Sequence, residues 1–165
     1  MATSVPLLEV SVEVWRRLLL HLQHQGGGAR ESGAFLLGSN SGGTRAAMSF
    51  LPYEELQADA LQEDYVHLSA PSFARLWDIC RSRNLTVVAD VHTHRFGPGQ
   101  SLSDATNPMV ALRGHVAIIV PNFAQGEVRP EDLGLYVYQG SHQWKAFRGR
   151  EVAQHLTFAS HGSET

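Results

Sequence analysis

LTVVADVHTHRFGPGQSLSD, residues 85–104, joins the strongest strand signal of the chain to a loop rich in glycine and proline. The run from Leu85 to Val91 is short, apolar and rich in β-branched residues. This composition is typical of a central strand that is buried on both faces. The glycines and proline at 97–99 predict a reversal of the chain, and Ser103 or Asp104 is expected to open the next helix.

Working outward from this stretch, alternation of short apolar runs with helical patterns predicts a mixed α/β domain. We expect one MPN/JAB-like domain over residues 1–160, with a curved mixed sheet, two or three packed helices and a disordered tail at 161–165. Trp15 and Trp77 are expected in the core. Strands are predicted at 34–37, 46–51, 65–68, 85–91, 115–120, 133–138 and 143–147, a loop at 52–64, and helices at 11–25, 69–83 and 103–113.

Composition narrows the classes of function. The chain has 165 residues, 43% of them hydrophobic, and a formal net charge of −3. It has no basic footprint for nucleic acid and no polybasic patch for a membrane surface. The single cysteine, Cys80, excludes an internal disulfide framework and is expected to be an inert core residue. No apolar run approaches the roughly 18 residues of a membrane helix, and no secretory signal layout is present. We therefore expect a cytoplasmic protein.

His92 and His94 are the residues that indicate chemistry. They stand two apart at the end of the predicted central strand, so both imidazoles project to the same side. The loop that follows is expected to return Asp104 to the same point. Two nitrogens and one carboxylate oxygen leave a fourth position for water, which is the pattern of a catalytic Zn²⁺ site.

Five other residues have expected roles in or near this array. Glu31, just before the strand at 34–37, is the best candidate for a general acid/base. The Ser101 hydroxyl is a candidate donor to the oxyanion of a tetrahedral intermediate, and Ser103 is a less well spaced alternative. Asp90 shares the side of the strand that carries His92 and is a candidate partner for that ligand. His115 is expected to be a satisfied core or edge histidine.

The array of Glu31, His92-x-His94, Ser101 and Asp104 resembles the JAMM motif of the MPN (JAB1/Mov34) metalloprotease family. The resemblance extends from Leu7 to about Phe147. It implies that the two histidines and Asp104 bind zinc, that Glu31 is the general acid/base and that Ser101 steadies the tetrahedral intermediate.

The resemblance also implies a substrate. It predicts hydrolysis of an isopeptide or peptide bond after the C-terminal glycine of ubiquitin or a ubiquitin-like protein, with E1/E2-like conjugation enzymes as possible partners. Two features depart from the family pattern. Six residues separate His94 from Ser101, one fewer than usual, and Arg95 stands where proline is common. Two alternatives stay open: a catalytically silent MPN scaffold, and a peptidase of the same fold acting on another peptide.

Overall fold

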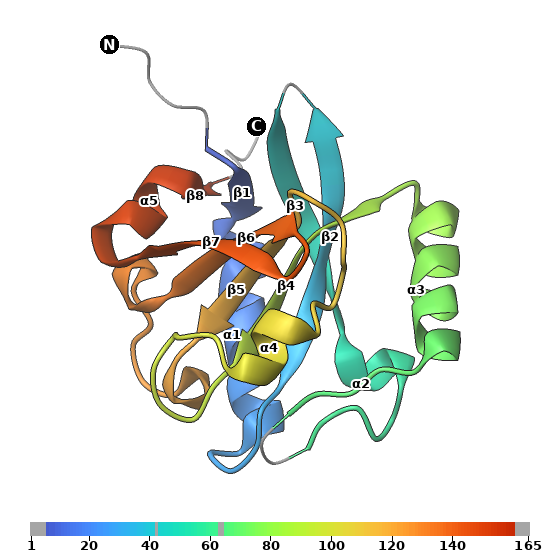
Figure 1. The fold of residues 1–165 in the computed structure, drawn as a ribbon, viewed down its shortest axis with the longest axis horizontal. Helices are drawn as coiled ribbons and strands as arrows, with labels where there is room; N and C mark the ends of the chain where they lie inside the picture. Colours follow the sequence, from blue (N-terminus) through green and yellow to red (C-terminus); the bar gives the residue numbers. More distant parts are fainter. Residues whose placement is uncertain (1–5, 42, 63–64, 161–165) are drawn as a thin grey trace, which may run out of the picture.

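The computed structural model describes residues 6–41, 43–62 and 65–160. Its strands form one mixed sheet in the order β7-β6-β5-β4-β2-β3-β1-β8, which curls through the centre of the molecule (Figure 1). The predicted mixed α/β class is therefore confirmed. The predicted tail at 161–165 lies outside the described residues. The strands are β1 (Leu8–Ser11), β2 (Gly33–Ser41), β3 (Thr44–Pro52), β4 (Thr86–Thr93), β5 (Val116–Val120), β6 (Gly134–Gly140), β7 (Gln143–Arg148) and β8 (Leu156–Ala159).

Five α-helices flank the sheet in the described part of the chain, rather than the two or three predicted. Only α1 and α3 are long, and the others have four or five residues. Such short helices carry almost no 3.6-residue periodicity, so sequence patterns miss them. The helices are α1 (Val12–Gly26), α2 (Tyr53–Leu56), α3 (Ala70–Arg83), α4 (Leu102–Thr106) and α5 (Val152–His155).

The two long helices pack on opposite faces of the sheet. Along β2, side chains alternate: Leu36 joins the core cluster under α1, and Phe35 joins the cluster under α3. Helix α1 begins at its N-cap, Ser11, and ends at Gly27, whose φ of 56° is readily adopted by glycine. Because both faces are covered, the central strands are buried and hold their side chains in fixed positions.

Several expectations for the first half of the chain need correction. The segment at 65–68 is not a strand and makes only an isolated bridge between Leu61 and Val66. The loop predicted at 52–64 contains helix α2, because Tyr53 and Leu56 are buried against the core of the α3 face. Trp77 is 38% exposed and lies outside the core, whereas Trp15 is buried as expected.

Two further differences from the prediction concern helix α4 and strands β1 and β8. The helix expected at 103–113 is only α4, and it ends at Thr106 because Pro108 cannot continue a helix. Strands β1 and β8 were not predicted. They pair with each other in parallel, although they are far apart in the sequence. Strands this short give no periodic signal. No helix among residues 6–41, 43–62 and 65–160 is long and apolar enough to span a membrane.

Candidate metal centre

The candidate site lies at the end of the central strand β4, on the face away from α1. Strands β2 and β5 flank β4, pairing Gly33 and Ile119 with His92. His92 is 6% exposed, and the His94 side chain is 13% exposed. The prediction of a central buried strand is confirmed; His92 lies on it, and His94 directly follows its last residue, Thr93. Its flanking strands fix the position of the His92 backbone on both sides.

The backbone after β4 is held by an unusual turn. The carbonyl of Val120 accepts from the His94 N–H, and the His94 carbonyl accepts from the Phe123 N–H, both at 2.9 Å. Asn122, Phe123 and Ala124 all have positive φ, between 52° and 60°. Left-handed residues other than glycine cost roughly 1–2 kcal/mol each. The chain sustains this strain where it fixes the second histidine.

Asp104 reaches the site from helix α4. The N-cap Ser101 and Asp104 form a reciprocal capping box: Ser101 Oγ accepts from the Asp104 N–H at 3.1 Å, and Asp104 Oδ2 accepts from the Ser101 N–H at 2.9 Å. The box fixes the carboxylate against the helix start. The loop reversal inferred from the sequence is therefore present.

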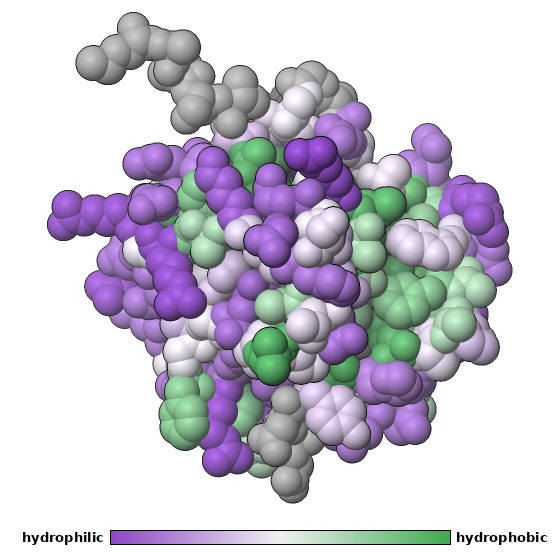
Figure 2. Space-filling view, in the orientation of Figure 1, coloured by the Kyte–Doolittle hydropathy of each residue, from purple (hydrophilic) through white to green (hydrophobic). Residues whose placement is uncertain are grey.

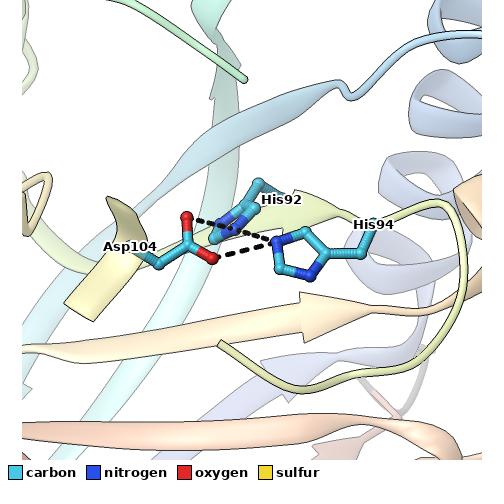
Figure 3. A group of neighbouring side chains, drawn as sticks. All are labelled: His92, His94 and Asp104. Atoms are coloured by element: carbon cyan, nitrogen blue, oxygen red, sulfur yellow. Dashed lines mark hydrogen bonds and ion pairs between the residues drawn. The ribbon is translucent and has the colours of Figure 1, made fainter. Parts of the chain in front are cut away.

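The three predicted ligands converge, and their side chains point toward one another (Figure 3). His92 Nε2 lies 3.1 Å from His94 Nε2 and 3.4 Å from Asp104 Oδ1. His94 Nε2 lies 3.0 Å from Asp104 Oδ2. Zinc with ligands at 2.0–2.1 Å in tetrahedral geometry places its donor atoms roughly 3.3 Å apart. The donor set therefore fits one small divalent cation with little movement.

The charges of the site also favour a cation. Burial opposes charge on His92, but hydrogen bonding with Asp104 and the nearby Asp90 carboxylate outweighs it and raises the pKa of His92 to about 10. Burial likewise opposes charge on Asp104, but hydrogen bonds from His92 and His94 hold the pKa of that carboxyl well below its usual range. Without a metal, a proton on His92 balances the carboxylates, and a cation would displace that proton.

A buried carboxylate, that of Asp90, lies close to His92. Asp90 is 2% exposed, and its Oδ1 accepts from His115 Nε2 at 2.5 Å. The Tyr53 hydroxyl donates to Asp90 Oδ2 at 3.5 Å. Burial would raise the pKa of Asp90, but the hydrogen bonds and charges of His115 and His92 together outweigh it, so the pKa is lowered. His115 is the satisfied core histidine expected. Tyr53 was missed, and the only signal for it was an aromatic residue in a polar segment.

Two long-range contacts fix the segment that carries Ser101 and Asp104. The Tyr136 hydroxyl on β6 donates to the Pro98 carbonyl at 2.6 Å. Trp144 Nε1 on β7 donates to the Ala105 carbonyl at 3.0 Å. The loop and helix α4 are thus tied to the β6–β7 hairpin. Neither contact leaves a pattern in the sequence that could reveal it.

The candidate metal centre opens into a cavity of about 250 Å³. Glu31, His92, Ser101 and Asp104 all line it, so the predicted acid/base and hydroxyl face the same space as two of the predicted ligands. Ser103, the alternative to Ser101, lines it too. Hydrophobic surface is visible between α4 and α3 (Figure 2). The apolar residues that complete the walls of the cavity are Val66, Leu68, Phe73, Met109, Ala117, Ile119 and Trp144.

Glu31 is placed by its neighbour Ser32. The Ser32 N–H donates to Thr93 Oγ1 at 3.0 Å, and the Thr93 N–H donates to the Ser32 carbonyl at 2.9 Å. These bonds join the residue after Glu31 to the residue between the two histidines. Gly33 follows, and a Cβ there would lie 2.3 Å from the Tyr53 ring. The close packing of Tyr53 therefore requires glycine at this position.

Cys80 has no part in the site. It is buried on the core face of α3, and burial raises the pKa of its thiol against the opposing charge of Arg83. A raised pKa keeps the thiol protonated and unreactive. The expectation of an inert core cysteine agrees with this placement.

Comparison with known proteins finds a similar fold in two solved structures. No protein-family model matches the chain. A solution structure of a Desulfitobacterium hafniense protein is similar at a TM-score of 0.66 and 12% identity, covering 94% of this chain and 95% of that chain. A Salinibacter ruber protein is similar at a TM-score of 0.60 and 16% identity, covering 94% and 93%. The chain therefore shares its whole fold with bacterial proteins of very different sequence.

Proposed function

We propose that this chain is a zinc-dependent hydrolase of the JAMM type. The observation that carries the proposal is the convergence of His92, His94 and Asp104 at donor spacings suited to zinc, with Glu31 and Ser101 on the adjoining cavity. A zinc ion held by these ligands would act as a Lewis acid and lower the pKa of a water molecule to near neutrality.

The protein's own groups would supply the remaining steps. Glu31 takes a proton from the attacking water and passes it to the leaving amine, which is general acid–base catalysis. Ser101 Oγ already accepts the Asp104 N–H, and its own proton is available for donation toward the developing oxyanion. His94 and Asp104 hold position because the strained turn and the capping box fix their backbones.

For the substrate, we propose the peptide or isopeptide bond after the C-terminal glycine of ubiquitin or a ubiquitin-like protein. The support is the resemblance of the motif, together with a cavity whose walls are partly apolar and lead to the metal ligands. E1/E2-like conjugation enzymes are the proposed partners. The proposal places the protein in the cytoplasm, where a thiol such as that of Cys80 stays reduced.

Two alternatives make different predictions. A silent scaffold would not need a complete ligand set, and the presence of three ligands, Glu31 and Ser101 around one cavity favours an enzyme. A peptidase with another substrate would bind zinc equally well and would not require a C-terminal glycine. Metal content therefore tests the first alternative, and substrate choice tests the second.

The experiment is cleavage of a ubiquitin-like protein fused through its C-terminal glycine to a reporter. We expect the purified protein to hold about one zinc per chain and to lose cleavage on treatment with a chelator. A matched fusion with a bulky residue in place of the final glycine should not be cleaved. Equal cleavage of both fusions would exclude the glycine preference, and absence of any bound zinc would exclude the enzyme.

A further inference from the structure

His92 has one ring nitrogen that does not face the other two predicted ligands. Its Nε2 faces His94 and Asp104, while its Nδ1 is buried and has no hydrogen-bond partner within residues 6–41, 43–62 and 65–160. A buried polar nitrogen without a partner costs roughly 1–3 kcal/mol. The Asp90 carboxylate lies close to it, with Oδ2 at 3.8 Å.

Coordination of a metal through Nε2 would determine the protonation of Nδ1 and therefore its hydrogen bonding. A neutral imidazole that gives its Nε2 lone pair to a metal carries its proton on Nδ1, which is then a donor. Ligating histidines generally donate this second N–H to a carboxylate, a carbonyl or water, which fixes the tautomer and the ring orientation. Asp90 is the carboxylate in position to accept it.

Asp90 is itself held from two elements that lie far apart in the sequence. His115, just before β5, bonds its Oδ1 at 2.5 Å, and Tyr53, in α2, donates to its Oδ2. Tyr53 is fully buried, and burial together with the charge of Asp90 raises its pKa well above the usual value, so the hydroxyl remains a donor. These two bonds keep the Asp90 carboxylate at the back of His92.

We propose that Asp90, oriented by His115 and Tyr53, is the positioning residue that accepts the His92 Nδ1–H in the metal-bound protein. A shift of about 1 Å would bring the 3.8 Å separation to the usual hydrogen-bond length. Asp90 thereby sets the tautomer of His92 and strengthens its bond to the metal. This inference rests on the proposed metal site and would hold whatever substrate the cavity accepts.

The decisive measurement is zinc affinity, determined by competition with a chromophoric chelator. Asp90→Asn keeps the size of the side chain and removes its charge, and we expect zinc to bind 10–100-fold more weakly. Ser11→Ala is the control. It removes the N-cap hydrogen bond from the Val14 N–H at the start of α1, which packs on the face of the sheet opposite the site, so it weakens the fold without touching His92. Its zinc affinity should stay within about threefold of wild type.

A second measurement covers the case in which Asp90→Asn fails to fold. In wild-type protein labelled with ¹⁵N-histidine and loaded with zinc, nitrogen–proton correlation spectra should show His92 protonated at Nδ1. In a folded Asp90→Asn protein this proton signal should move or exchange faster.

The outcomes separate the two ideas. A wild-type protein that holds no zinc would overturn both the metal site and the role of Asp90. Zinc binding with a proton on Nε2 of His92, or with equal affinity in Asp90→Asn, would overturn only the role of Asp90. Equal weakening of zinc binding in Ser11→Ala would show that the effect of Asp90→Asn is general destabilisation.

Discussion

Replacing Ser101 with alanine should remove two interactions that can be measured separately. The first is the N-cap of α4, in which Ser101 Oγ accepts from the Asp104 N–H at 3.1 Å. Such a cap contributes about 1 kcal/mol, and here it also orients Asp104, a proposed metal ligand. Because 1.4 kcal/mol is tenfold in a binding constant, the variant should bind zinc roughly fivefold more weakly.

The second interaction is the proposed hydrogen bond from the Ser101 hydroxyl to the developing oxyanion. Its loss should cost roughly 2.7–4 kcal/mol at the barrier, or about 10²–10³ in kcat. The assay is chelator competition for zinc affinity, followed by cleavage of one fusion at saturating zinc. At saturation the weaker binding no longer matters, so the fall in kcat isolates the hydroxyl donor.

Ser103→Ala is the control for this prediction. Ser103 lines the same cavity two residues away, but it is not the N-cap of α4. Its removal should leave zinc affinity and kcat within about twofold of wild type, because surface substitutions away from caps and ligands have small effects. Full turnover by zinc-loaded Ser101→Ala, or a large loss in Ser103→Ala, would refute the assignment of the hydroxyl.

Three further predictions follow from the site and the core. Glu31→Gln should keep its zinc and lose about 10²–10⁴ in kcat, whereas His94→Ala should lose zinc and activity together, as measured by elemental analysis and turnover. Because the pKa of His92 is about 10 before metal binds, loading near neutral pH should release about one proton per zinc, measurable by calorimetry in buffers of different ionisation enthalpy. Leu36→Ala, fully buried in β2, should lower the free energy of unfolding by about 2–5 kcal/mol. The same change at Leu20, 59% exposed on α1, should cost under about 0.5 kcal/mol in denaturant titrations.

The sequence revealed the parts of the site that depend on local geometry. Strand alternation placed His92 and His94 on one side, and cap chemistry placed Asp104 in the first turn of a helix. Both are properties of a few neighbouring residues. The early end of α4 also had a local signal, because Pro108 follows two residues after Thr106.

The rest depended on contacts between distant residues. Tyr53 reaches Asp90 across 37 positions of the chain, and Trp144 reaches Ala105 across 39. The pairing of β1 with β8 joins the two ends of the domain. No periodicity in the sequence encodes such contacts, because they form only when distant segments come together in the folded sheet. Pairing with a distant segment also decides whether a strand forms. The pattern of residues 65–68 predicts a strand, but in the structure this segment forms only an isolated bridge.

The attachment of α4 to the β6–β7 hairpin has a consequence for the order of folding. His92 lies on β4 and His94 directly follows it, but Asp104 is placed only when Tyr136 and Trp144 have reached Pro98 and Ala105. Closing contacts of such sequence separation is slow relative to local structure. We therefore expect a refolding chain to gain full metal affinity late, after β6 and β7 have joined the sheet. A bound ion would then slow unfolding more than it speeds folding.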